Sequence, residues 1–189
     1  MTKKLLSILI LLFGLAACCD KKDDLEVVKD FEKENKYFKA GLKSIHFTIE
    51  TSPINEVDSV FNSFVKHHNI PTSAIGCKDG IYTGTSPYDA YDYAHTVTIE
   101  IKDQKIVAID YNEVNMDQTG KEENLEYNKE MSVAGTSPSI AYPKMEKQML
   151  DNQNYNQVDA VAGATYSLYR FRYALSIALM KAKLNVNEN

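Results

Sequence analysis

The segment from Asp159 to Ser167, with the sequence Asp-Ala-Val-Ala-Gly-Ala-Thr-Tyr-Ser, has the residue types and the position to do chemistry. It stands directly before a helical pattern, so its backbone N–H groups would lie at the positive end of a helix dipole and could hold a phosphate. Gly163 permits a sharp turn, and Thr165 offers a hydroxyl where a phosphate would rest. The same residues also suit an ordinary helix start with Thr165 or Ser167 as N-cap.

The elements that must position this segment are a helix after it and a sheet before it. The helix has the clearest periodicity in the chain, with apolar residues at Leu168, Phe171, Leu175, Ala178, Leu179 and Ala182. Two strands are indicated by alternation, and they contain Val97, Ile99, Ile101, Ile106, Ala108 and Tyr111. Residues 102–105 would join these strands in a tight hairpin.

Further elements complete an α+β domain. A short strand should follow the turn at Asp79 and Gly80, and residues 123–133 and 138–152 are predicted to be helical. Antiparallel strands with helices gathered after them predict an α+β fold, an antiparallel sheet with flanking helices.

Residues 25–75 are predicted to form a small helix-strand-helix region with no recognisable chemistry. Residues 25–40 have helical spacing, and Gly41 would end that helix. Ile45, Phe47 and Ile49 alternate with polar residues and predict a strand over residues 44–51. A second helix would start at Ser52-Pro53.

The N-terminus predicts export and lipidation. Lys3 and Lys4 precede an apolar run of residues 5–17, which spans roughly 20 Å as a helix and falls short of the ~30 Å hydrocarbon core. Residues 1–17 are therefore predicted to be a signal peptide. Leu-Ala-Ala before Cys18 resembles the lipobox of bacterial lipoproteins, whose cysteine is acylated and becomes the new N-terminus; an ordinary signal with an incidental cysteine is the alternative. Residues 18–24 would then be a lipidated tether.

Composition excludes several classes of function. Cleavage after residue 17 removes two lysines, so the net charge of −5 becomes −7, which argues against nucleic acid as a partner. Cys19 and Cys77 are too few for a disulfide framework or a zinc site, and we predict neither a metal site nor a catalytic residue. His95 is interpreted as a surface histidine. Arg170 and Arg172 are interpreted as solvated helix charges, with assistance to a bound phosphate as the alternative.

Two motifs together resemble the FMN-binding domain family. Asp159-x-x-x-Gly163-Ala164-Thr165 precedes the last helix, and Asp-Gly-x-Tyr-x-Gly opens the domain at Asp79. The resemblance defines a domain at residues 79–184 and does not extend to residues 25–75. Within that family the chain resembles covalently flavinylated lipoproteins of extracytoplasmic electron transfer and lipoproteins labelled major membrane immunogen.

The resemblance implies a cofactor and its site. An FMN transferase would move FMN from FAD onto Thr165, Gly163 and Ala164 would form the phosphate turn, and Asp159 would belong to the recognition motif. Tyr166 and Ser167 complete the expected cofactor-binding set, and Tyr88, Tyr91 and Tyr93 could stack on the flavin ring. The family has serine or threonine where this chain has Ala162, a loss of one hydrogen bond, roughly 0.5–1.5 kcal/mol.

The implied protein is an electron carrier rather than a self-contained enzyme, because the cofactor does the redox chemistry. It would sit in the cell envelope, periplasmic or at the cell surface, held to a membrane by its lipid anchor. Its partners would be the FMN transferase and redox proteins or the quinone pool. The alternative is a non-redox surface lipoprotein that keeps the fold and binds a partner or an unattached ligand. Ala162 favours this alternative, and the intact Gly-Ala-Thr favours the carrier.

Overall fold

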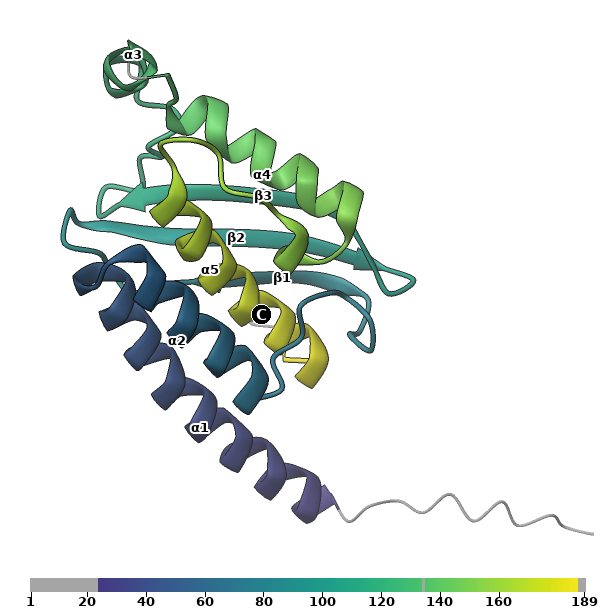
Figure 1. Cartoon of the computed structure of the whole chain (residues 1–189). Helices are drawn as coiled ribbons and strands as arrows, with labels where there is room; N and C mark the ends of the chain where they lie inside the picture. The colour runs from purple at the N-terminus through teal and green to yellow at the C-terminus, as the bar shows by residue number, and fades with distance from the viewer. Residues whose placement is uncertain (1–23, 134, 187–189) are drawn as a thin grey trace, which may run out of the picture.

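The computed structural model describes residues 24–133 and 135–186 (Figure 1). The predicted signal peptide, Cys18 and the tether up to residue 23 lie outside these residues. Among the described helices, none has the length and apolar character needed to cross a membrane.

The centre of the fold is an antiparallel sheet of three strands, β1 (Gly80–Thr85), β2 (Tyr93–Lys102) and β3 (Lys105–Asn115), in the order β1-β2-β3. The predicted hairpin joins β2 to β3 through Asp103 and Gln104, which both have positive φ, 50° and 59°. The Gln104 side chain also accepts a hydrogen bond from the Gly76 N–H at 3.1 Å. This contact holds Gln104 in the turn, although glutamine is not a residue type that favours positive φ.

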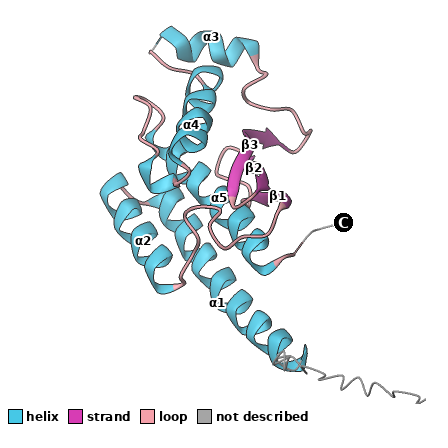
Figure 2. Cartoon of the chain, turned by 90° about the vertical axis from the view of Figure 1, so that its right-hand side faces the viewer, coloured by secondary structure: helices cyan, strands magenta, loops and turns pink. Residues whose placement is uncertain are grey.

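Helices cover one face of the sheet (Figure 2). α5 (Thr165–Leu184) packs on β1 and β2, and α4 (Pro138–Asn152) packs on β3. The approach of α5 requires Gly84, because a Cβ there would lie 2.0 Å from the Ala174 carbonyl oxygen. The opposite face stays open, as the exposure of Ile81 and Val107 indicates. The predicted α+β fold is confirmed.

Two short elements complete the domain. α3 (Leu125–Val133) stands at the edge of the fold, and a 3-10 turn, η1 (Tyr155–Gln157), links α4 to the loop before α5. The predictions for residues 123–133 and 138–152 therefore agree closely with α3 and α4.

The N-terminal region is two helices, and the predicted helix-strand-helix arrangement is wrong. α1 (Asp24–Thr51) continues through the expected strand, and α2 (Ile54–His67) follows after Ser52 and Pro53. We call this pair the α1–α2 hairpin. Phe47 is exposed while Ile45 and Ile49 are buried, so the apolar residues follow a helical face and not strand alternation. Gly41 does not end α1; a Cβ there would lie 2.2 Å from the Phe64 ring, so the glycine lets α1 and α2 approach closely.

The hairpin also packs on the rest of the domain. Both of its helices contact α5, and Phe61 of α2 makes edge contacts with the rings of Tyr155 and Tyr169. Phe61 and Val57 are each 1% exposed and belong to the same hydrophobic cluster as the inward face of the sheet. The hairpin is thus part of one core.

Candidate functional site

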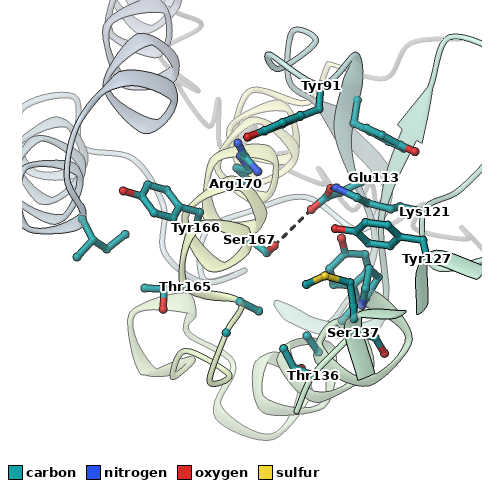
Figure 3. Close-up of a pocket in the computed structure, with 18 of the residues that line it drawn as sticks. Tyr91, Glu113, Lys121, Tyr127, Thr136, Ser137, Thr165, Tyr166, Ser167 and Arg170 are labelled. Carbon is teal, nitrogen blue, oxygen red and sulfur yellow. Dashed lines mark hydrogen bonds and ion pairs between the residues drawn. The ribbon is translucent and has the colours of Figure 1, made fainter. Parts of the chain in front are cut away.

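A cavity of about 770 Å³ lies at the start of α5 (Figure 3), a size typical of small-molecule sites. The first turn of α5 forms one wall, with Thr165, Tyr166 and Ser167. The loops and helices around α3 and α4 form a second wall, and β3 and its flanking residues form a third. The turn between α1 and α2 closes the remaining side with Pro53 and Ile54.

The start of α5 has the features of an anion-binding helix end. Its N-cap is Ala164, which makes no side-chain cap hydrogen bond, so the expectation that Thr165 or Ser167 serves as N-cap is wrong. The first N–H groups of the helix are therefore left without a side-chain acceptor. Gly163 has φ +83°, and a Cβ there would lie 2.8 Å from Thr136 Cγ2. Both the backbone conformation and the neighbour require glycine at this turn.

Most of the predicted cofactor-binding residues lie together. The cavity wall contains Gly163, Ala164, Thr165, Tyr166 and Ser167. Asp159 is not part of this wall: its backbone N–H donates to Gln148 Oε1 at 2.8 Å, and its carbonyl accepts from Gln148 Nε2 at 3.3 Å. Gln148 thereby anchors the loop that leads into the Gly163 turn.

The opposite wall is rich in tyrosine. Tyr91, Tyr93, Tyr127 and Tyr142 line the cavity, and together they offer flat surfaces for a ring system. Tyr88, which the sequence grouped with Tyr91 and Tyr93, is not among the lining residues.

Thr136 is unusual among the residues that border the cavity. Within the described part of the chain, its Oγ1 is the buried side-chain oxygen or nitrogen that has no hydrogen-bond partner. Such an atom costs free energy unless a partner satisfies it. Its position beside Gly163 adds a polar group close to the start of α5.

A buried charge network forms the floor of the cavity. His95 lies between two carboxylates, with Nε2 3.3 Å from Asp89 Oδ2 and Nδ1 3.6 Å from Glu113 Oε1. Glu113 also contacts Lys121 Nζ at 2.7 Å and accepts a hydrogen bond from Ser167 Oγ at 3.3 Å. The network therefore runs from the buried Asp89 to a residue of the first turn of α5.

Both carboxylates are held in their charged form. Burial alone would raise the pKa of Asp89, but hydrogen bonds from His95 and from the backbone N–H groups of Tyr93 and Tyr91 outweigh it, and the pKa lies well below its usual range. Burial also acts to raise the pKa of Glu113, and His95 and Lys121 outweigh it, so this pKa is lowered too.

The network is better described as ion pairing than as a metal centre. One ligand atom each from Asp89, His95 and Glu113 lies within 4.8 Å of the others, which is close enough for a metal ion. However, the two carboxylates face different nitrogens of the His95 ring. Lys121 already contacts Glu113, and Arg170 Nη2 lies 3.7 Å from Asp89 Oδ2. These cations supply the positive charge that the carboxylates need.

Three interpretations from the sequence are wrong. His95 is 1% exposed and not a surface residue. Arg170 makes a two-point contact with Glu50, and Arg172 is buried and donates to the backbone carbonyls of Tyr155 and Val158. The sequence did contain a signal for the histidine: it lies two residues before Val97 and so shares the inward face of that strand.

The residues present fit a ligand with an anionic group at one end and a flat ring at the other. The start of α5 suits the anionic group, and the tyrosines suit the ring. Lys121 and Arg170 line the same cavity as donors that are paired with Glu113 and Glu50. In Figure 3, Thr165 and Arg170 lie at different levels of the cavity, with Ser167 between them.

Part of the chain is similar to a known family and to two solved structures. The family model of the FMN-binding domain matches residues 91–180. The crystal structure of the CPE2226 protein from Clostridium perfringens is 32% identical over 59% of this chain and 93% of that chain, with a TM-score of 0.55. A solution NMR structure from Clostridium thermocellum is 21% identical over the same shares of the two chains, with a TM-score of 0.34. No curated protein matches the chain.

Proposed function

Because the chain belongs to the FMN-binding domain family and FMN is its cofactor, we propose that it carries FMN covalently on Thr165 and works as a membrane-anchored, extracytoplasmic electron carrier. One observation carries this proposal: Thr165 is the first residue of α5 and lines the cavity, directly after a turn that requires Gly163. Its hydroxyl thus stands beside uncapped N–H groups that suit a phosphate.

The attachment is a balanced group transfer. Thr165 Oγ1 forms a bond to the phosphorus of the FMN half of FAD, the pyrophosphate bond breaks, and AMP leaves. The hydroxyl proton passes to a base of the transferase or to water, and no electrons move. A threonine hydroxyl is a weak nucleophile, so activation belongs to the transferase.

The residues of this chain would hold and orient the cofactor, while the flavin itself supplies the redox chemistry. The first turn of α5 would hold the phosphate end, and the tyrosines that line the cavity would contact the ring. Lys121 and Arg170 also line the cavity, where they are paired with Glu113 and Glu50, and their remaining N–H groups could donate hydrogen bonds to the ligand. Tyr91 and Tyr166 line the cavity and are 73% and 41% exposed, so a partner protein or quinone could approach the ring there.

The membrane anchor rests on the sequence around Cys18. Acylation of this cysteine would hold the domain near a membrane through a short tether, and two or more acyl chains are enough for stable attachment. Export would also place the protein where it meets an extracytoplasmic transferase and redox partners.

The test is intact-protein mass after co-expression with an FMN transferase, together with in-gel flavin fluorescence under denaturing conditions. Wild type should gain the mass of one FMN less one water. Thr165→Val keeps the β-branched shape but has no hydroxyl, so it should fold and gain nothing. Ser167→Ala is the matched control: it removes a nearby hydroxyl and should still carry the adduct. Wild type without an adduct in the presence of a competent transferase would favour the non-redox lipoprotein instead.

A further inference from the structure

The α1–α2 hairpin contributes to the cavity although it lies outside residues 91–180, which match the family. We propose that the hairpin is a working part of the ligand site, and that Glu50 is a positioning residue that holds Arg170 in the cavity wall for contact with the ligand. This inference rests on the proposed function, because it takes FMN as the ligand.

The hairpin reaches the cavity at its turn. Pro53 and Ile54 line the cavity, and the Ser52 carbonyl accepts a hydrogen bond from the hydroxyl of Tyr166 at 3.1 Å. Tyr166 follows Thr165 directly. The turn of the hairpin is therefore tied to the first turn of α5, where the cofactor phosphate is proposed to lie.

Arg170 joins the hairpin to the floor of the cavity. Its Nε donates to Glu50 Oε1 at 3.1 Å and its Nη2 donates to Glu50 Oε2 at 2.9 Å. The two side chains are only 14% and 13% exposed. A two-point contact between a guanidinium and a carboxylate fixes direction as well as distance. Glu50 thus decides where the Arg170 guanidinium lies.

Glu50 is needed to hold Arg170 because buried carboxylates also attract the same guanidinium. Arg170 Nη2 also lies 3.7 Å from Asp89 Oδ2, a side chain with no exposed surface. Without the Glu50 charge, the guanidinium would keep only the attraction of the buried carboxylates Glu113 and Asp89 and would move toward them. Arg170 stands five residues after Thr165, about 7.5 Å along the helix axis. Because Thr165 and Arg170 lie at different levels of the cavity (Figure 3), we expect the guanidinium to contact a part of the ligand away from the phosphate.

The contact between α5 and the α1–α2 hairpin also offers a matched control variant. The hydroxyl of Tyr169 donates to Asp58 Oδ1 at 2.7 Å, which also joins α5 to the hairpin through one carboxylate. Neither Tyr169 nor Asp58 lines the cavity. Asp58→Asn should therefore weaken the docking of the hairpin without changing the position of Arg170.

The experiment measures FMN affinity by fluorescence titration of purified full-length protein made without a transferase. Glu50→Gln should weaken binding at least fivefold, a typical size for coupling between sites. Arg170→Gln should weaken binding at least as much, and the double variant should add nothing, because both changes remove one contact. Asp58→Asn should bind within twofold of wild type, although its melting temperature falls.

Amide hydrogen exchange gives a second measurement that needs no variant. FMN should slow exchange at residues 50–54 of wild type, because the ligand would hold the turn of the hairpin closed. Equal affinities for Glu50→Gln and Asp58→Asn, or unchanged exchange at residues 50–54 on FMN binding, would overturn the inference. Those outcomes leave the proposed function standing, because the mass of the covalent adduct tests it separately. Wild type that binds no free FMN would likewise overturn this inference and not the covalent attachment.

Discussion

Replacing Glu113 with glutamine removes the negative charge that Lys121 Nζ contacts at 2.7 Å beneath the cavity. The side chains are 1% and 13% exposed, so water replaces little of the lost attraction. Removing one partner of a buried ion pair costs about 3–5 kcal/mol. Lys121 keeps its contacts with the rings of Tyr93 and Tyr127, and we therefore expect a loss near the lower limit, about 3 kcal/mol.

The assay is a double-variant cycle of urea unfolding at pH 7 on flavin-free protein, with Glu113→Gln, Lys121→Met and the double variant. The single variants should each lower the free energy of unfolding by about 3 kcal/mol. The double variant should lose less than the two single losses added together, with a coupling of about 2 kcal/mol. The methionine keeps most of the packing of the lysine stem while it removes the charge.

The same cycle has a definite pH dependence. The pKa of Glu113 is lower in the folded protein than its ordinary value, so its contribution is fully present above the unfolded pKa of about 4.3 and is lost as the pH falls through the folded value. The gap in stability between wild type and Glu113→Gln should therefore be constant from pH 7 to pH 5 and narrow below about pH 4. Additive losses, or a gap that widens in acid, would show that Glu113 is not held by this pair.

Two further results are expected. Gly84→Ala should cost about 3 kcal/mol or more, because the added Cβ would lie 2.0 Å from the Ala174 carbonyl oxygen. Gly135→Ala is the control: this glycine has φ +99° and a Cβ there would meet no atom within 4 Å, so the variant should lose only about 1 kcal/mol through backbone strain. Thermal unfolding compares the two variants, and equal losses would refute the close approach of β1 and α5. Cys18→Ala should abolish palmitate labelling and detergent partitioning, whereas Cys19→Ala should keep both; label that persists without Cys18 would contradict the lipid-anchor assignment.

The N-terminal region shows where the sequence misled us. Ile45, Phe47 and Ile49 alternate with polar residues, but Phe38, Leu42, Ile45 and Ile49 also follow a helical face, and all four are buried. Period two and period 3.6 share several spacings over so short a stretch. Only packing against α2, which leaves Phe47 exposed, separates the two patterns.

α5 could be predicted because its pattern is long. All six of its predicted apolar positions are buried, and the helix begins at Thr165, directly after the Gly-Ala pair. A helix of this length repeats its period often enough to exclude other structures. The fold class followed from the same local patterns.

The charged residues beneath the cavity were harder to predict. His95 was interpreted as a surface residue because of its residue type, although its position in the strand indicates the inward face of the sheet. His95 is paired with Glu113 in the β2–β3 register, and it lies two residues before Val97 on the same face of β2. Strand periodicity alone therefore indicates that both charged residues face inward. Arg170 and Glu50 are different: 120 positions separate them. No local pattern in one sequence can indicate such a pair.

α5 begins in the cavity and then fills the centre of the protein, with Leu175, Ala178 and Leu179 fully buried against the sheet. A group bonded to Thr165 is therefore attached to a helix whose later turns lie in the core of the domain. The phosphate end of such a group would keep its place whether the group is oxidised or reduced. Every partner that docks at the mouth of the cavity would meet a cofactor held at the same point of the domain.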